Sequence, residues 1–329
     1  MNSTRKQLQI LIEQNRLAPK DTEAAARVSG VLPTSSAWLQ FLDRALLMLG
    51  CLAISCSLMF FVAYNWLEFG RFAKFALLES VIVLATIAYV FFQRSKTSNL
   101  VSQAALLVAC LSLGVLLALF GQTYQTGADP WQLFFNWALL MVPWLLLSRS
   151  SWLWLFWCVL LNTSLVLWMH AYGVSIFHYG KSMSTMWATL VLNASILVAW
   201  ELASNRFSWI ANRWATHTLS AFAIYAVTLA ALTVRFTDSG LTMLIALLSI
   251  FGAGYVYIKL KPDLFTLTML ALSVSVIALT LFGEFVFNTS SDAIGASLIM
   301  IFATLAIGTT CTVWLKNVHK RLLNQEAAS

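Results

Sequence analysis

Residues 101–120 read VSQAALLVACLSLGVLLALF and contain no charged side chain. Their apolar residues form one continuous run instead of the alternating pattern of a half-buried strand. A helix of about 20 residues is long enough to span the hydrocarbon core of a bilayer, because each residue rises 1.5 Å. The stretch therefore predicts a helix that crosses a membrane.

Similar runs fill most of the chain. Of its 329 residues 60% are hydrophobic and only 10% are charged, with a mean hydropathy of +0.79, whereas a soluble domain carries about 25% charged residues. The pattern predicts an all-α fold, namely a polytopic transmembrane helical bundle of about ten helices. The expected crossings are residues 45–64, 72–92, 101–120, 131–148, 152–171, 184–202, 215–234, 240–259, 264–283 and 293–315.

The division between the fourth and fifth crossings depends on a short polar break. Residues 131–171 are too long for one span, and Ser148-Arg149-Ser150-Ser151 is the polar break within them. We interpret it as a tight hairpin between two helices. Pro143 removes a backbone donor and is expected to kink the fourth helix.

Lysine and arginine predict the orientation, because positively charged loops stay in the cytoplasm. Of the twenty Lys and Arg residues, the ten crossings place only Arg71, Lys74, Lys181 and Arg235 on the outer side. An even number of crossings puts both termini in the cytoplasm. The expected localisation is a bacterial inner membrane.

Three regions follow from this pattern. Residues 1–44 are expected to form a cytoplasmic helical segment, residues 45–315 the transmembrane domain, and residues 316–329 a cytoplasmic basic tail. Within the first region, residues 3–15 and 21–27 read as a helical hairpin, either an interfacial anchor or a docking surface for a partner. No apolar core with a cleavage site precedes the first crossing, so we expect that crossing to remain as an anchor.

Two polar stretches end the first and third crossings on the predicted outer side. The first contains Asn65, Trp66 and Lys74, and the second contains Gln122, Tyr124 and Asp129. Together they offer donors, acceptors and both signs of charge, so they are candidate ligand-binding residues. The alternative is that these loops are merely polar and that Asn or Gln caps free backbone groups at helix ends.

These phrases resemble the family of bacterial membrane proteins known as domain of unknown function 2157, over about residues 5–150. Members have a short N-terminal helical segment, a first crossing that ends in a phrase like Ala-Asn-Trp, and then further polar phrases in a similar order. The matching residues here are Asn65-Trp66, Lys74, Gly121-Gln122-Thr123-Tyr124, Asp129 and Trp131. Tyr64 replaces the alanine. The resemblance implies a bacterial inner membrane and supports treating the two phrases as one site, but it implies no activity.

Three polar residues lie within apolar runs. Glu79 is in the second crossing, where an ionised carboxylate is unfavourable, so we expect it either to bind a proton or cation in an outward cavity or to be neutral and hydrogen-bonded to another helix. Asn162 and Asn193 lie near the middle of the fifth and sixth crossings. An unpaired amide there is unfavourable, so we predict an interhelical hydrogen bond.

Other functional classes lack their usual signs. The five cysteines lie in apolar runs without a C-x-x-C pair, and His170 and His178 have no third ligand at a fixed spacing, so we expect no metal and no cofactor. The basic residues are spread between crossings and do not form a nucleic-acid-binding face. Signatures of P-loop, zinc-protease and serine-hydrolase chemistry are missing, so an enzyme is not favoured.

The sequence thus favours a membrane protein that binds or transports a small polar solute, ion or lipid headgroup at an outer polar site. Its expected partners are the lipid bilayer and such a ligand. The alternative is a scaffold or sensor that does not transport and whose loops dock a partner protein, and an enzyme acting on a lipid-linked substrate comes third.

Overall fold

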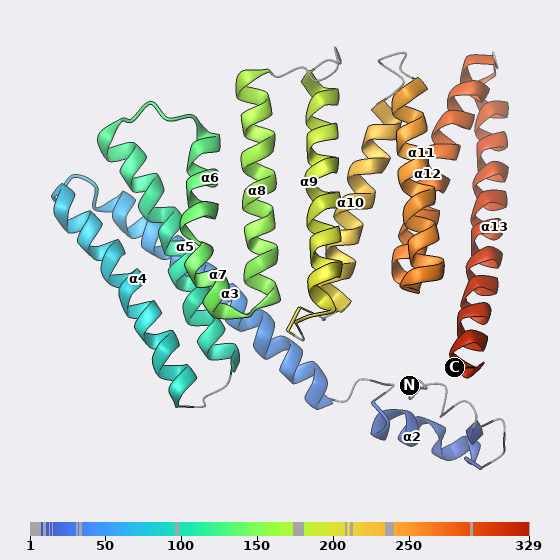
Figure 1. Cartoon of the computed structure of the whole chain (residues 1–329), viewed down its shortest axis with the longest axis horizontal. Coiled ribbons are helices and arrows are strands. Elements are labelled where there is room, and N and C mark those ends of the chain that lie inside the picture. Colours follow the sequence, from blue (N-terminus) through green and yellow to red (C-terminus); the bar gives the residue numbers. More distant parts are fainter. Residues whose placement is uncertain are drawn as a thin grey trace. The chain divides into compact units, whose positions relative to one another are not determined.

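The computed structural model describes residues 8, 11–12, 14, 16–30, 32, 35–95, 99–173, 181–207, 209–210, 213–233, 240–289 and 292–328. Every regular element in these ranges is helical (Figure 1). In chain order they are η1 (Pro19–Asp21), α2 (Thr22–Val28), α3 (Ser35–Tyr64), α4 (Arg71–Arg94), α5 (Asn99–Tyr124), α6 (Pro130–Leu140), α7 (Val142–Ser148), α8 (Ser151–Tyr172), α9 (Lys181–Ser204), α10 (Arg213–Thr233), α11 (Gly240–Tyr255), η3 (Val256–Leu260), α12 (Leu264–Thr289) and α13 (Ala293–Ala328).

Nine helices in the described ranges are long and apolar enough to cross a membrane. They are α3, α4, α5, α8, α9, α10, α11 with η3, α12 and α13. The pair α6 and α7 passes the same test when it is taken as one span, which brings the number to ten. The predicted polytopic helical bundle is therefore confirmed.

The tenth span is bent by 40° between α6 and α7. Pro143 lies in the first turn of α7, where it has no amide hydrogen to donate to the carbonyl of Leu139 four residues earlier. The expected kink is confirmed. After Ser148, Arg149 has a φ of 45° and ends α7, and α8 begins at Ser151. The polar break is therefore the tight connection that the sequence predicts.

Several helices extend beyond the predicted crossings. α3 begins at Ser35 and α13 continues to Ala328, because helical hydrogen bonds form within the segment whether or not lipid surrounds it. At the N-terminus, α2 corresponds to the second helix of the predicted hairpin. Most of the first helix, residues 3–15, lies outside the described residues.

The chain divides into two compact units, and each is described by itself. The first comprises Met1–Thr123 with Leu322–Ser329, and the second comprises Tyr124–Arg321. In the first unit, α3, α4 and α5 contribute Val62, Leu78 and Leu119 to a buried cluster. Cys51 of α3 also donates its thiol to the Ala104 carbonyl of α5 at 3.6 Å. These contacts join the three helices.

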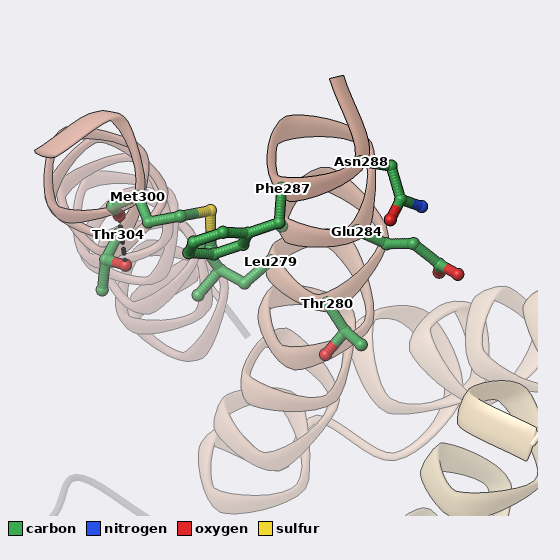
Figure 2. A pocket seen from close by; sticks show the side chains of 8 residues that line it. Leu279, Thr280, Glu284, Phe287, Asn288, Met300 and Thr304 are labelled. Atoms are coloured by element: carbon green, nitrogen blue, oxygen red, sulfur yellow. Dashed lines mark hydrogen bonds between the residues drawn. The ribbon is translucent and has the colours of Figure 1, made fainter. Parts of the chain in front are cut away.

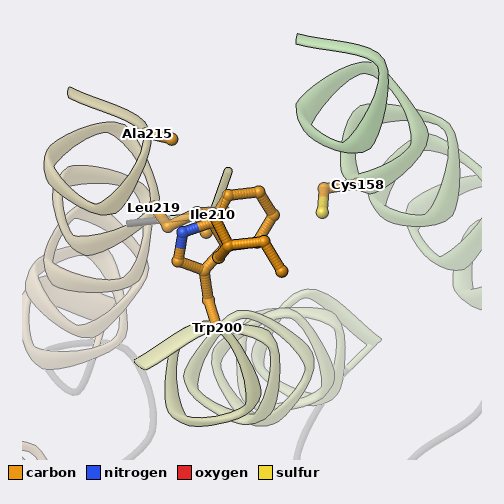
Figure 3. Close-up of a cluster of buried hydrophobic side chains, with 5 residues drawn as sticks. All are labelled: Cys158, Trp200, Ile210, Ala215 and Leu219. Atoms are coloured by element: carbon orange, nitrogen blue, oxygen red, sulfur yellow. The ribbon is translucent and has the colours of Figure 1, made fainter. Parts of the chain in front are cut away.

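In the second unit, α10 packs against α8, α9, α11 and α12. One face of α10 consists of buried Ala215, Leu219, Ala223, Ala226 and Ala230, and such small side chains let neighbouring helices approach closely in lipid. Figure 3 shows this face at its N-terminal end, where the indole of Trp200 from α9 lies beside Leu219 and Ile210.

A pair of asparagines joins α8 to α9. The Asn193 side-chain amide donates to Asn162 Oδ1 at 2.7 Å, and the Asn162 amide donates to Asn193 Oδ1 at 3.3 Å. Each amide also donates to a carbonyl of its own helix, at Thr189 and Cys158 respectively. The predicted interhelical hydrogen bond is confirmed. The pair lines a mostly apolar cavity of about 860 Å³ between α8, α9 and α10.

Candidate functional site

In the first unit the structure brings two of the predicted residues together. Lys74 of α4 is 5% exposed. Its Nζ donates to the carbonyl oxygen of Trp66 at 2.6 Å and lies 3.6 Å from the centroid of the Trp66 ring. Trp66 lies in the turn between α3 and α4. A cation over an aromatic face is attracted by the ring quadrupole, so the turn and the charge stabilise each other.

The other predicted residues of this unit lie separately. Asn65 donates to the Phe61 carbonyl at 2.9 Å, which satisfies the end of its own helix. Glu79 is exposed on α4 next to the fully buried Leu78, and Gln122 is exposed in the last turn of α5. A binding role for these residues stays a prediction.

In the second unit, Asp129 precedes α6 and is shared by two aromatic residues. Its Oδ2 accepts a hydrogen bond from the Trp131 indole and another from the Tyr172 hydroxyl, each at 3.4 Å. The rings of Trp131 and Tyr172 meet edge to face at 6.2 Å. Asp129 and Trp131 were predicted, whereas the contribution of Tyr172 from α8 was not. Tyr124 is 51% exposed, and His178 lies outside the described residues.

The sequence did not predict a polar cluster in the second unit at the ends of α9 and η3. Lys261 Nζ forms an ion pair with Glu201 Oε2 at 2.6 Å and donates to the Glu201 backbone carbonyl at 2.8 Å. The Tyr257 hydroxyl donates to Glu201 Oε1 at 3.2 Å. Glu201 therefore accepts hydrogen bonds from two residues, Tyr257 and Lys261, that lie 56 and 60 positions later in the chain.

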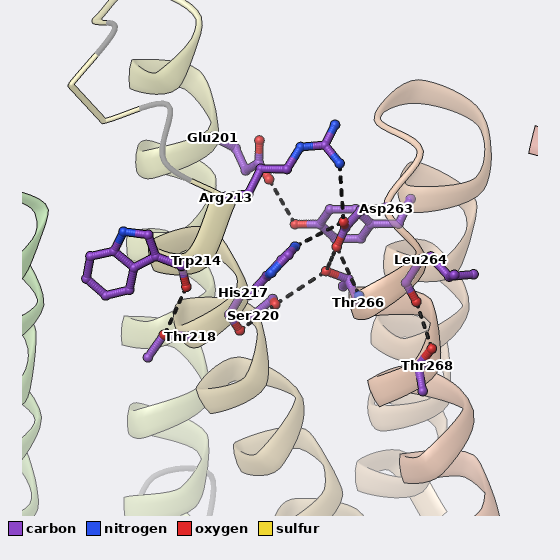
Figure 4. Close-up of polar contacts among 11 residues, drawn as sticks. Glu201, Arg213, Trp214, His217, Thr218, Ser220, Asp263, Leu264, Thr266 and Thr268 are labelled. Atoms are coloured by element: carbon purple, nitrogen blue, oxygen red, sulfur yellow. Dashed lines mark hydrogen bonds and ion pairs between the residues drawn. The ribbon is translucent and has the colours of Figure 1, made fainter. Parts of the chain in front are cut away.

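A second set of contacts surrounds Asp263, which precedes α12 (Figure 4). Its Oδ2 accepts hydrogen bonds from the Thr266 amide at 3.0 Å and the Thr266 hydroxyl at 2.6 Å, as expected for a helix N-cap. Its Oδ1 lies 3.1 Å from His217 Nε2 and 4.0 Å from Arg213 Nη1. His217 also stacks on Phe265 at 4.4 Å.

These contacts determine the ionisation of Asp263. Burial by itself raises the pKa of Asp263, but the hydrogen bonds from Thr266 and His217 and the charge of His217 lower it further, so the net pKa is below the ordinary value of 3.8. Asp263 is therefore a carboxylate at neutral pH. As an ionised acceptor it suits the cationic side chains that face it.

The two sets of contacts line one small cavity of about 280 Å³. Its walls include both carboxylates, Glu201 and Asp263, and three cationic or titratable side chains, Arg213, His217 and Lys261. The Arg213 side chain is 80% exposed. In the sequence, Arg213 and Lys261 belong to the Lys and Arg residues on the predicted cytoplasmic side, which indicate orientation and no site. The signal that could have revealed the cluster is an acid beside each of two positively charged connections, namely Glu201 in the last turn of α9 and Asp263 just before α12.

A third polar feature lies at the other end of α12. Glu284, Asn288 and Thr280 of α12 line a cavity of about 710 Å³ together with Met300 and Thr304 of α13. Figure 2 shows Phe287 pointing toward Met300, while Glu284 and Asn288 project on a different side of α12. The space between the two helices is therefore mainly apolar where Phe287 fills it.

Comparisons with known proteins identify the N-terminal part of the chain. A search of the curated proteins found no match, and a search of the solved structures also found none. Residues 9–154 match the family model described as "Predicted membrane protein (DUF2157)". This range covers the turn of Trp66, the buried Lys74, Asp129 and Trp131, but not Tyr172, and it confirms the predicted resemblance. Over residues 9–154, a little under half of its length, the chain is similar to the DUF2157 family of predicted membrane proteins.

Proposed function

We propose that this membrane protein binds a small zwitterionic solute and moves it across the bacterial inner membrane. The observation that carries the proposal is the cavity between Glu201, Lys261, His217, Asp263 and Arg213. Five charged or titratable side chains converge there at the ends of apolar helices. Such residues in membrane proteins commonly mark pathways for substrates, ions or protons.

Size and charge favour this class of solute. The cavity of about 280 Å³ is smaller than the pockets of about 300–1,000 Å³ that take drug-sized ligands. Arg213 Nη1 lies 4.0 Å from Asp263 Oδ1, which is too long for a hydrogen bond, and the side chain is largely exposed. Its guanidinium therefore has donors for the carboxylate of a solute. Glu201 supplies carboxylate oxygens for an ammonium group. An amino acid carries one carboxylate, which matches Arg213, and one ammonium group, which matches Glu201.

The predicted outer residues of each unit keep their own roles in this proposal. In the first unit, Asn65, Trp66 and Gln122 would recognise polar groups and Lys74 would complement charge. In the second unit, Tyr124 would recognise polar groups and Asp129 would complement charge. Lys74 donates to the Trp66 carbonyl and is 5% exposed, so its positive charge would act on a solute at the turn of Trp66 from below the surface. Glu79 is the candidate for coupling to a proton or ion.

The transport experiment uses purified full-length protein in sealed vesicles and a panel of radiolabelled amino acids. We expect uptake of at least one of them above protein-free vesicles. Arg213→Gln should lower uptake at limiting solute by about ten- to a hundredfold, because a hydrogen bond to a charged group contributes about 1.5–3 kcal/mol.

Lys316→Gln in α13 is the matched control, because Lys316 does not line this cavity, and it should leave uptake unchanged. If the wild-type protein neither binds nor takes up any amino acid of the panel, the proposal is wrong.

The alternative is a scaffold or sensor, and one observation favours it. α2 lies outside the membrane-spanning helices, and its last residue, Val28, is 90% exposed. An apolar side chain on a charged helix is a feature of surfaces that contact a partner protein or a membrane. The vesicle experiment separates the two functions, because a scaffold gives no uptake.

A further inference from the structure

A separate cavity of about 670 Å³ lies in the second unit, between α7, α8, α9 and the connection from α9 to α10. Four tryptophans form much of its wall: Trp154, Trp157, Trp200 and Trp209. The ring of Trp154 meets that of Trp157 at 5.6 Å and that of Trp209 at 6.2 Å. Tryptophan prefers the boundary between lipid headgroups and acyl chains. The wall therefore suits a molecule that has both a polar and an apolar part.

The cavity has cationic groups at its edge. Arg149 follows α7 and Arg206 follows α9, so two connections far apart in the sequence each contribute one guanidinium. Both side chains are exposed, and no Asp or Glu is among the described residues that line the cavity. This composition differs from that of the cavity proposed for the solute, which is lined by both cationic side chains and carboxylates. Two guanidiniums without a carboxylate are complementary to a phosphate, which they bind through paired hydrogen bonds.

Unmatched donors in the wall point to the same chemistry. The indole nitrogens of Trp154 and Trp200 are buried, and neither has a hydrogen-bond partner within the part of the chain that the structure describes. Trp200 is 95% buried, since it is 5% exposed. By contrast, the neighbouring Trp157 donates to the Ala138 carbonyl at 2.9 Å. Buried donors are normally satisfied, so the wall has capacity for additional acceptor oxygens.

The rest of the lining is apolar and mostly aliphatic, from Leu146, Cys158, Ile196, Ala199, Ala203, Phe207 and Ile210. These side chains carry no charge, so this part of the cavity suits an acyl chain. We infer that this cavity binds an anionic phospholipid, with its phosphate between Arg149 and Arg206 and one acyl chain along the tryptophan wall. This site is independent of the proposed solute transport.

Native mass spectrometry of the purified full-length protein in detergent tests the inference. The probes are short-chain phosphatidylglycerol, short-chain phosphatidylcholine and inorganic phosphate. We expect the protein to retain phosphatidylglycerol in preference to phosphatidylcholine, because only the former has a net negative charge. Arg149→Gln with Arg206→Gln should weaken phosphatidylglycerol binding by about tenfold or more, while Lys316→Gln should leave it unchanged.

A second variant covers the case in which the glutamine substitutions prevent folding. Arg149→Lys with Arg206→Lys keeps both charges but loses the planar fork, so it should bind phosphatidylglycerol more weakly than wild type does. Equal binding of the two lipids, binding by either double variant as tight as wild type, or inorganic phosphate that competes as well as phosphatidylglycerol would overturn the inference.

Discussion

Lys74 and Asp263 show how a single charged side chain is held at the end of an apolar helix. Lys74 has the face of an indole and one backbone carbonyl, so no carboxylate is needed to hold it. Asp263 instead accepts hydrogen bonds from the first turn of α12 and from His217. In both cases the partners lie at the end of a helix, and the adjoining helix is held in place through them.

Asp263→Asn should destabilise the protein by about 1–2 kcal/mol at neutral pH, because it removes the charge from a helix cap. The folded-state pKa of Asp263 is lowered, so its carboxylate contributes stability above the ordinary pKa, and that contribution is lost as the pH falls through the lowered pKa. Thermal unfolding in detergent, followed by circular dichroism from pH 7 to pH 3, measures the difference between wild type and variant.

We expect this difference to be constant down to about pH 4 and to shrink in more acidic solution. Thr268→Val is the control, since the Thr268 hydroxyl bonds only its own helix at the Leu264 carbonyl. A difference that grows on acidification would contradict the assignment of Asp263 as an ionised cap.

At the scale of the elements, the contact between α8 and α9 depends on the Asn162 and Asn193 pair. A double-mutant cycle with Asn162→Leu and Asn193→Leu should give a coupling of about 1 kcal/mol, as expected for polar pairs between membrane helices. Unfolding in mixed detergent micelles measures it.

The control cycle combines Asn193→Leu with Thr163→Val. The Thr163 hydroxyl donates to the Val159 carbonyl of its own helix, so this second coupling should be close to zero. Couplings of equal size in the two cycles would show that the asparagine pair is not a specific link between the helices.

How far the sequence predicts an element depends on which force determines it. The crossings were predictable because the bilayer constrains each segment separately, and the kink was predictable because Pro143 has no amide hydrogen to donate. The pair of Trp66 and Lys74 was also predictable, since only eight positions separate Trp66 in the turn from Lys74 at the start of α4. Glu201 and Lys261 are 60 positions apart. Their contact depends on how helix ends pack, which hydropathy does not encode.

For the whole molecule, the number of spans and the distribution of Lys and Arg predict that both termini face the cytoplasm. Fusions of a green fluorescent protein to either end should fluoresce in a bacterial host, whereas alkaline phosphatase at the same positions should be inactive, because it requires the oxidising periplasm. Alkaline phosphatase inserted after Gly127, in the connection between α5 and α6, should be active. Opposite results at the two termini would require an odd number of crossings.

The bend between α6 and α7 has a mechanical consequence for the membrane itself. A straight helix has a fixed reach of about 1.5 Å per residue, so it meets a thinner or thicker bilayer only by tilting as a whole. A rod with a joint near its middle changes its vertical reach by opening or closing the angle at that joint, while both ends keep their anchors. The 40° bend therefore gives this pair a shorter reach than a straight helix with the same number of residues.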